Sequence, residues 1–319
     1  MKLNIERGEL LKSLGHIQSV VERRNTIPIL SNVLLESEDG RLNLAATDLD
    51  IAIGESVVAE TQEPGGITAP AHTLYDIVRK LPDGSQVELY YDLDSTRLSI
   101  SAGRSRFTLS CLPREDFPVM SEGEFPVNFK VTGVNLKRLI DKTRFAVSTE
   151  ETRYYLNGIY LHAATDDNGE NVLRGVATDG HRLARFDMDQ PEGAADMPGI
   201  IVPRKAVGEL RKLIDEYEGE VKVSLSDTKI RFSFSDIVLT SKLIDGTFPD
   251  YTRVIPEGND KNMEVNSNVL AESVDRVSTI STDKTRSVKL AMGAGQLKLS
   301  VHSPEHGTAT EELLVSYES

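Results

Sequence analysis

Apolar residues recur at spacings of three and four in several stretches of the chain, a period typical of helices with one buried face. In the first stretch, Leu10, Leu14 and Ile17 mark such a face. Pro70 and Pro203 open two others, near a first helical turn where a missing N–H donor does no harm. We therefore predict amphipathic helices over residues 7–24, 70–81, 134–145 and 203–214.

Between these helices, short runs alternate apolar and polar side chains, as strands with one buried face do. Turn signals such as Glu38-Asp39-Gly40 separate the runs. Together the patterns predict the α+β class, with repeated domains that each pack two helices on antiparallel sheets. The predicted strands are residues 2–5, 29–30 with 33–35, 42–44, 51–53, 87–91, 98–101, 106–110, 129–131, 221–225, 230–234, 238–242 and 263–265.

The same motifs return at a domain-sized interval. Ala46-Thr47-Asp48 and Ala177-Thr178-Asp179 lie 131 residues apart, and so do Phe117-Pro118 and Phe248-Pro249. Because this interval is far longer than the repeat of a solenoid, each copy is expected to have its own core. We predict domains at residues 1–125, 126–256 and 257–319.

The third copy is shorter than the second. The segment Ser148–Arg153 returns 133 residues later as Ser281–Arg286, but the copy that starts near Lys261 stops 59 residues on, where the second copy extends from 129 to 255. Half a sheet leaves an unpaired edge and uncovered apolar surface. We therefore expect an incomplete third domain, without its C-terminal half, in a truncated chain.

The distribution of charge points to a polyanion even though the total charge does not. The formal net charge is −14, which by itself argues against a nucleic-acid partner. The predicted helices nevertheless carry 14 basic and 5 acidic residues, a net +9, which leaves −23 for the remainder. We interpret this as one basic surface; the alternative is that Lys and Arg only solvate exposed helix faces. The basic residues are Arg7, Lys12, Arg23, Arg24, Arg79, Lys80, Lys137, Arg138, Lys142, Arg144, Arg204, Lys205, Arg211 and Lys212.

The sequence offers little for catalysis. It contains no Walker-type phosphate loop, no Gly-x-Gly-x-x-Gly before a helix, no His-Glu-x-x-His and no Cys-x-x-Cys. Asp179-Gly180-His181-Arg182 lacks the ligand count of a zinc site and a visible nucleophile, so its residues either cap a turn or bind a partner. We expect no catalytic residue, no cofactor and no metal.

Other sequence features bear on the location of the protein and on its single cysteine. The start of the chain does not resemble a signal peptide, and no apolar run is long enough to span a bilayer. These features predict a soluble, cytoplasmic protein. The single cysteine, Cys111, is expected to be a small core side chain.

Three long motifs carry a resemblance to a known family. They are residues 152–158 (Thr-Arg-Tyr-Tyr-Leu-Asn-Gly), residues 177–184 (Ala-Thr-Asp-Gly-His-Arg-Leu-Ala) and residues 245–256 (Asp-Gly-Thr-Phe-Pro-Asp-Tyr-Thr-Arg-Val-Ile-Pro). With residues 26–32, they make the whole chain resemble the bacterial DNA polymerase III beta subunit, the replicative sliding clamp. The resemblance implies a non-catalytic accessory subunit, a processivity factor whose head-to-tail homodimer closes as a ring around duplex DNA.

The resemblance also implies three sets of site residues. The candidates for contact with DNA are Arg24, Arg79, Lys137, Arg138, Tyr154, Tyr155, Arg204 and Lys205. A pocket for short peptides of the clamp loader, the polymerase III catalytic subunit and other clamp-binding proteins would use Leu156, Thr178, Gly180, His181, Arg182, Leu183, Pro249, Arg253 and Val254. The dimer interface would join Arg104, Arg106, Phe107 and Leu109 of one protomer to Thr279, Ile280, Glu305 and Glu311 of the other.

Two other functions have sequence features in their favour. The acidic total charge fits a multidomain protein-interaction scaffold with no DNA role, which would show no salt-sensitive retention on circular DNA. A hydrolase built around Asp179 and His181 would lose its turnover in a His181→Ala variant. Because the basic residues concentrate on corresponding helices of successive copies, the sequence favours the clamp over both.

Overall fold

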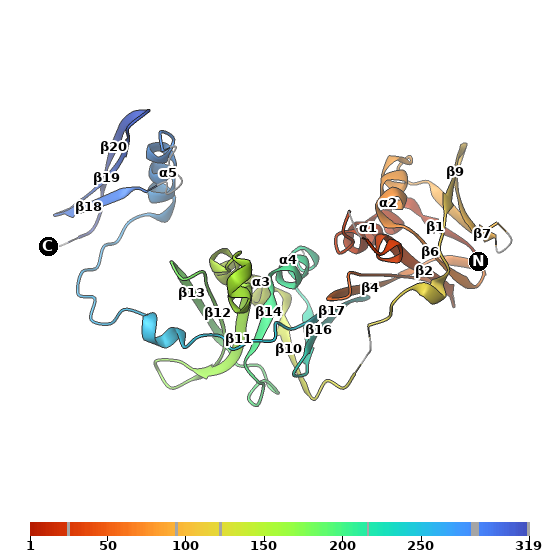
Figure 1. Cartoon of the computed structure of the whole chain (residues 1–319), viewed down its shortest axis with the longest axis horizontal. Helices are drawn as coiled ribbons and strands as arrows, with labels where there is room; N and C mark the ends of the chain where they lie inside the picture. The colour runs from red at the N-terminus through yellow and green to blue at the C-terminus, as the bar shows by residue number, and fades with distance from the viewer. Residues whose placement is uncertain (24–25, 93–94, 121–122, 216, 282–286, 318–319) are drawn as a thin grey trace. The chain divides into compact units, whose positions relative to one another are not determined.

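The computed structural model describes residues 1–23, 26–92, 95–120, 123–215, 217–281 and 287–317. They form two compact units, Met1–Phe248 and Pro249–Ser319 (Figure 1). Within the first unit, two modules follow each other along the chain. Both combine helices with antiparallel sheets, which confirms the predicted α+β class.

In the first module, one helix follows the first strand and the other follows the sixth. Its elements are β1 (Lys2–Glu6), α1 (Arg7–Gln18), β2 (Asn32–Glu38), β3 (Arg41–Thr47), β4 (Ile51–Val58), β5 (Glu60–Glu63), β6 (Gly65–Pro70), α2 (Ala71–Lys80), β7 (Gln86–Asp92), β8 (Arg97–Ala102) and β9 (Ser105–Ser110). The β2–β3 turn lies where the sequence placed it, with positive φ at Asp39 (50°) and Gly40 (75°). Cys111 is half-buried against the core, and burial raises the pKa of its thiol.

The second module repeats this order with fewer strands between its helices. Its elements are β10 (Val127–Thr132), α3 (Gly133–Thr143), β11 (Gly158–Thr165), β12 (Asn171–Thr178), β13 (Leu183–Asp189), β14 (Ile200–Pro203), α4 (Arg204–Leu213), β15 (Glu220–Leu225), β16 (Lys229–Phe234) and β17 (Ile237–Lys242). Single-turn 3₁₀ segments lie at Pro28–Ser31, Arg114–Asp116, Arg144–Ala146 and Tyr251–Val254, and a longer one at Glu151–Leu156.

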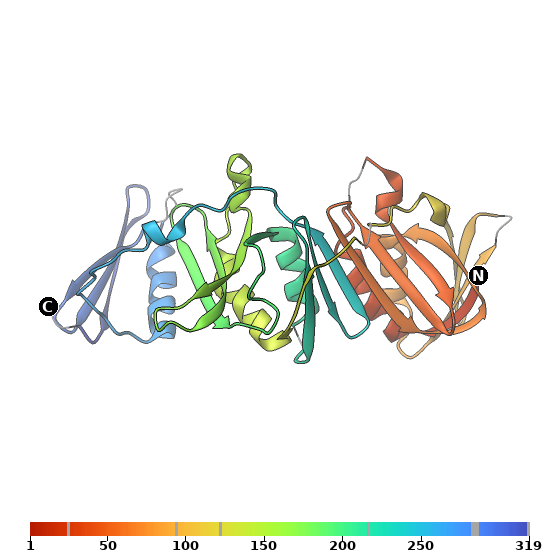
Figure 2. The same ribbon diagram turned by 90° about the horizontal axis from the view of Figure 1, so that it is seen from below.

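An eight-stranded sheet joins the two modules, in the order β10-β15-β16-β17-β4-β3-β2-β6 (Figure 2). The joining step is the antiparallel pair of β17 and β4, which runs from Ile237 opposite Glu55 to Ser241 opposite Ile51. Main-chain ladder bonds therefore cross the module boundary. The other sheets of this unit are β5-β1-β7-β8-β9 and β13-β12-β11-β14.

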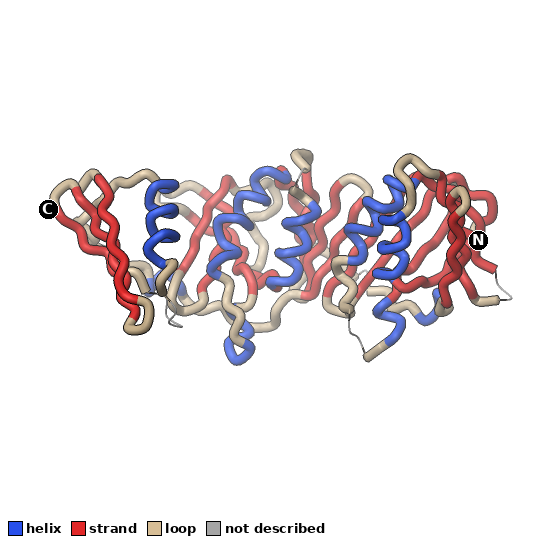
Figure 3. The backbone as a smooth tube through the Cα atoms, turned by 90° about the horizontal axis from the view of Figure 1, so that it is seen from above, coloured by secondary structure: helices blue, strands red, loops and turns tan. Residues whose placement is uncertain are grey.

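The four helices of the first unit lie along one side of its sheets (Figure 3). They are held there by burial of their apolar faces: Leu10 and Leu14 of α1 and Leu74 of α2 have no exposed surface. In the second module, Leu139 of α3 and Leu210 of α4 are almost as well covered. The polar faces of all four helices are left on the same side of the unit.

The predicted helices are found, but the first ends early. It was expected over residues 7–24 and stops at Gln18, with Ser19 as its C-cap. The Ser19 hydroxyl donates to the carbonyl of His16, so this side chain satisfies a helical acceptor at the end of the helix. Val20 and Val21 are still buried, which explains why the apolar period extends beyond the helix itself.

Two strand predictions were wrong. Residues 29–30 were expected in a strand but lie in the 3₁₀ turn Pro28–Ser31, since Pro28 fixes the φ angle that begins such a turn. Residues 263–265 form no strand; only an isolated bridge joins Glu264 to Ser316. The remaining predicted strands lie within β2–β4, β7–β9, β15–β17, β1 and β10.

The second unit is smaller. Its elements are α5 (Ser267–Ser278), β18 (Lys289–Gly293), β19 (Gln296–Ser303) and β20 (Gly307–Leu314). The helix packs on the sheet β18-β19-β20 around Val277, Leu297, Leu299 and Leu313. On β18, Leu290 and Met292 are half exposed although they pair with the buried Leu299 and Leu297. This edge therefore carries exposed apolar side chains.

Candidate nucleic-acid interface

Many of the predicted cations are already bonded to carboxylates of this chain. The ion pairs join Arg7 to Asp83, Arg79 to Asp76, Lys137 to Asp215, Arg144 to Asp141, Lys205 to Glu22 and Asp48, Arg211 to Asp141 and Asp215, and Lys212 to Glu209. The cations of these pairs lie on the helices of the first unit or at their ends, whereas Asp48 belongs to the turn between β3 and β4. The basic surface is therefore less strongly positive than its lysines and arginines alone indicate.

A smaller set of the predicted cations has no carboxylate within ion-pair distance among the described residues. This set is Lys12, Arg23, Lys80, Arg138, Lys142 and Arg204. Arg138 and Arg204 belong to the predicted DNA contacts. The guanidinium of Arg138 lies 5.4 Å from the ring centroid of Phe186. This cation–π contact positions the side chain without neutralising its positive charge.

The other predicted cations differ in their surroundings. Arg79 bonds Asp76 on its own helix at 3.0 Å and lies over the Tyr75 ring. Arg24 lies outside the described residues. Arg79 and Lys137 are thus candidates that must leave, or share, an acidic partner to bind a phosphate.

Lys205 joins the two modules. Its ammonium bonds Asp48 and, at 3.3 Å, Glu22, both from the first module. Partial burial acts to lower the pKa of Lys205, but the bonds and attraction to the two carboxylates outweigh it and raise the pKa. Ser19 adds a 2.5 Å bond to Glu209 of α4. Two ion pairs and one hydrogen bond therefore hold α4 to the first module.

Tyr154 and Tyr155 lie in the 3₁₀ segment that follows α3. Their rings meet edge to face, with centroids 5.8 Å apart, and Tyr154 is 54% exposed. Arg153, between Glu150 and these rings, makes a two-pronged bond to Glu150. Tyr154 presents an exposed aromatic face, while Tyr155 is half-buried.

The turn between β12 and β13 is tightly bonded within itself. The Asp179 carboxylate accepts the amides of His181 and Arg182 and the Nε of Arg182. Slight burial acts to raise the pKa of Asp179, but these bonds outweigh it and lower the pKa. Thr178 donates to the carbonyl of Arg182 at 2.8 Å. Asp179 therefore shapes the turn, and this geometry gives a hydrolase no free base.

Gly180 sits at the tip of this turn with φ of 87°, a conformation that favours glycine. A Cβ there would lie 2.6 Å from a guanidinium nitrogen of Arg153. Around it, His181 and Arg182 are exposed and Leu183 is half-buried, whereas Leu156 is a core side chain at 4% exposure. Thr178, Gly180, His181, Arg182 and Leu183 are brought together at this turn.

The remaining residues of the predicted peptide pocket belong to the second unit. Arg253 bonds Asp250 at 2.8 Å, Val254 is 67% exposed, and Pro249 is exposed. The pocket that would combine these residues with the β12–β13 turn stays a prediction.

The predicted dimer contacts are divided between the two units. Arg104, Arg106, Phe107 and Leu109 lie on or beside β9, the last strand of its sheet. Phe107 pairs with the buried Ile100 yet is 38% exposed. In the second unit, Thr279 and Glu305 are exposed and Ile280 packs on the small core. Glu311 accepts bonds from Arg276 and Ser273, and these bonds lower its pKa.

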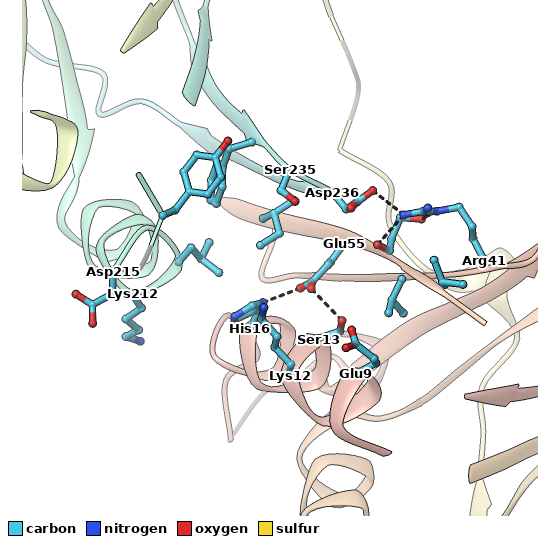
Figure 4. Close-up of a pocket in the computed structure, with 17 residues that line it drawn as sticks. Glu9, Lys12, Ser13, His16, Arg41, Glu55, Lys212, Asp215, Ser235 and Asp236 are labelled. Carbon is cyan, nitrogen blue, oxygen red and sulfur yellow. Dashed lines mark hydrogen bonds and ion pairs between the residues drawn. The ribbon is translucent and has the colours of Figure 1, made fainter. Parts of the chain in front are cut away.

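Sequence reasoning did not find a cavity of about 700 Å³ between α1, β4, the end of α4 and the β16–β17 turn (Figure 4). Its wall includes Glu55, whose carboxylate bonds Ser13 at 2.9 Å and His16 at 2.8 Å. Arg41 bonds Asp236 across the module boundary. Because residues of two modules line the cavity, no local sequence motif predicts it.

Two further features bear on the class of site. Within the described ranges, no three His, Cys, Asp or Glu side chains are grouped so that they could hold a metal ion. In the same ranges, no helix combines the length and apolar character needed to cross a bilayer.

Comparison with family models accounts for nearly all of the chain. Residues 1–121 match the N-terminal domain of the DNA polymerase III beta subunit, residues 130–250 its central domain and residues 252–319 its C-terminal domain. The beta sliding clamp of Caulobacter vibrioides is 56% identical over 318 residues, which span 100% of this chain and 85% of that relative. The beta sliding clamp of Escherichia coli K12 is 39% identical, with 99% and 85% covered.

Solved structures agree with the sequence comparisons. This chain is similar to the Caulobacter crescentus beta sliding clamp with PEG bound to a putative beta-motif tethering region, with a TM-score of 0.96 at 56% identity. It is also similar to the sliding clamp of Bartonella birtlesii bound to griselimycin, with a TM-score of 0.95 at 54% identity. Both similarities cover 100% of this chain and 85% of the other.

Proposed function

The chain belongs to the DNA polymerase III beta subunit family, and from this we propose that it is a sliding clamp, a processivity factor that encircles duplex DNA and tethers the replicative polymerase. The observation that carries the proposal is the match of three beta-subunit domains, in order, along the chain. An acidic scaffold without DNA has no comparable support. In this role the protein acts as a cytoplasmic accessory subunit without catalysis of its own.

Binding to DNA would rest on the helix side of the first unit. Lysine and arginine attract phosphates without reading bases, so the affinity is independent of sequence and falls steeply with salt. Arg138 and Arg204 are the first candidates, because no carboxylate in the described structure pairs with them. Arg24, Arg79, Lys137, Lys205, Tyr154 and Tyr155 complete the proposed set.

Partner proteins would bind at the β12–β13 turn. Gly180 lets a peptide backbone approach closely, and Leu183 with Val254 would cover apolar anchors of a short linear segment. The partners proposed are the clamp loader, the polymerase III catalytic subunit and other proteins with a clamp-binding motif. Their peptides would also contact Arg182, His181, Arg253 and Pro249.

The ring would close by a head-to-tail homodimer. Among the described strands, β9 is at the edge of its sheet and carries the exposed Phe107, features that favour pairing with another chain. We propose that β9 meets the second unit of the partner near Thr279, Ile280, Glu305 and Glu311.

A topological experiment tests this function. The full chain is loaded by a clamp loader on a nicked circular plasmid, passed through a gel-filtration column at high salt, and compared with the same plasmid cut once. We expect retention on the circle and loss from the linear form, because a closed ring leaves only over an end. Equal retention on both, or retention on neither, would exclude the encircling clamp.

A further inference from the structure

Five charged side chains alternate in sign across the α3–α4 side of the second module. Asp215 pairs with Lys137 at 2.8 Å and with Arg211 at 2.7 Å. Asp141 pairs with the same Arg211 at 2.8 Å and with Arg144 at 3.4 Å. We call these five residues the charge ladder. It bridges α3, which carries Lys137 and Asp141, and the end of α4.

Asp215 holds two cations at once. It lies just beyond the last residue of α4, and one carboxylate oxygen accepts both Lys137 Nζ and Arg211. Hydrogen bonds from Lys137 and Arg211, with their attraction, lower the pKa of Asp215 to about 2. Its carboxylate is therefore ionised at neutral pH.

The position of Asp215 affects what the helix side can offer a phosphate. Its side chain is 57% exposed, and the cations Arg138 and Lys142 of α3 are exposed as well. A phosphate near α3 would be repelled by this carboxylate and would compete with it for Lys137. The bonded Lys137 is 36% exposed, so it can reach an incoming anion once released.

We propose that Asp215 limits how tightly the α3–α4 side binds duplex DNA, by holding Lys137 and Arg211 and by repelling phosphate. This inference rests on the proposed function, and it gives Asp215 an affinity-setting role. A clamp that slides needs contacts that break readily. An acid that competes for the cations keeps each contact weak without removing the positive charge that attracts DNA.

The Asp215→Asn variant isolates this role. Asparagine keeps the shape and an acceptor oxygen, and Lys137 retains its 2.9 Å bond to the main-chain carbonyl of residue 215. Only the charge is lost. The variant should therefore keep its fold, and a thermal melt checks this.

Glu220→Gln is the matched control. Glu220 bonds one lysine, Lys130, at 2.8 Å, and the substitution changes the total charge by the same amount. Lys130 alternates along β10 with the buried Phe129 and Val131, whose side chains face the core with α3, so Lys130 points to the opposite side of the sheet.

The measurement is the affinity of the full chain for a short fluorescein-labelled duplex, by anisotropy, at salt concentrations from about 50 to 200 mM. We expect Asp215→Asn to bind more tightly than the unaltered chain. Its affinity should also fall about threefold more steeply over this range for each additional phosphate that it neutralises, since each one adds about −0.9 to the salt slope. Glu220→Gln should match the unaltered chain. Arg138→Ala should bind more weakly.

The possible outcomes separate the two proposals. If Asp215→Asn binds no more tightly than Glu220→Gln while Arg138→Ala weakens binding, the role of Asp215 is excluded and the DNA-binding function stands. If the unaltered chain has no salt-dependent affinity for the duplex, both proposals fail.

Discussion

At the scale of single residues, Asp187 links charge to stability. It accepts two bonds from the buried Arg174, at 2.7 and 2.8 Å, and a third from Arg185 at 2.8 Å. Partial burial acts to raise the pKa of Asp187, but the bonds from both guanidinium groups outweigh it and lower the pKa from 3.8 to about 2. The folded state therefore favours the ionised carboxylate.

The first prediction concerns this residue. Asp187→Asn should lower the free energy of unfolding at pH 7 by about 1–2 kcal/mol, because the buried Arg174 guanidinium loses its two bonds to an ionised carboxylate. Because Asp187 is partly exposed to solvent, the loss of stability should be smaller than for a fully buried ion pair. Chemical denaturation followed by circular dichroism measures the change.

The pH dependence gives a second readout of the same pair. A lowered folded pKa means that the stabilisation is present above about pH 4 and disappears as the pH falls towards 2. The unaltered chain should thus lose more stability than Asp187→Asn between these values. Parallel pH profiles for the two proteins would contradict the assignment.

At the scale of elements, the two helices within each module are linked in the same way. A cation of the first helix bonds main-chain carbonyls at the C-terminal end of the second. Arg7, at the start of α1, donates to the carbonyls of Val78 (3.1 Å) and Arg79 (2.6 Å) at the end of α2. Lys137 of α3 donates to the carbonyl of Asp215 beyond α4. Both arrangements place positive charge at the C-terminal end of a helix, where the helix dipole is negative.

The second prediction follows from this cap. Arg7→Ala should destabilise the protein by about 1–2 kcal/mol and speed amide exchange at the C-terminal turn of α2. Lys12→Ala is the control, because Lys12 is an exposed cation on the same helix with no acidic partner in the described structure. Equal effects of the two substitutions, measured by hydrogen exchange and denaturation, would show that the cap adds nothing.

At the scale of the whole molecule, the proposed dimer makes the third prediction. Native mass spectrometry at micromolar concentration should give twice the 35.2 kDa of one chain. Phe107→Ala should shift the population towards monomer, since aromatic side chains dominate many interfaces. Val119→Ala removes a more exposed apolar side chain away from β9 and should leave the dimer intact. A monomer for the unaltered chain would exclude this route to a ring.

The periodicity of the sequence was enough to predict most elements. Leu10, Leu14 and Ile17 define the face of α1, and Ile230, Phe232 and Phe234 alternate in β16, because local spacing decides which side chains share a face. The repeats likewise indicated successive modules and, through the longer motifs, the family. The boundaries at 125/126 and 256/257 stay a prediction.

Other features depended on residues that are distant in the chain. The pairing of β17 with β4 joins residues 237–241 to residues 51–55, and no local pattern specifies which strand edges meet. The charges of Lys137, Lys205 and Arg211 were evident, but their acidic partners were not, because most of those partners come from other elements.

The sequence by itself thus determined the modules, their amphipathic helices and the family, since these depend on the order and spacing of neighbouring side chains. Only the tertiary structure decided which cations remain available to a polyanion and how two modules share one sheet. Ion pairing and strand pairing require atoms within a few ångströms of each other, and that proximity is created by folding.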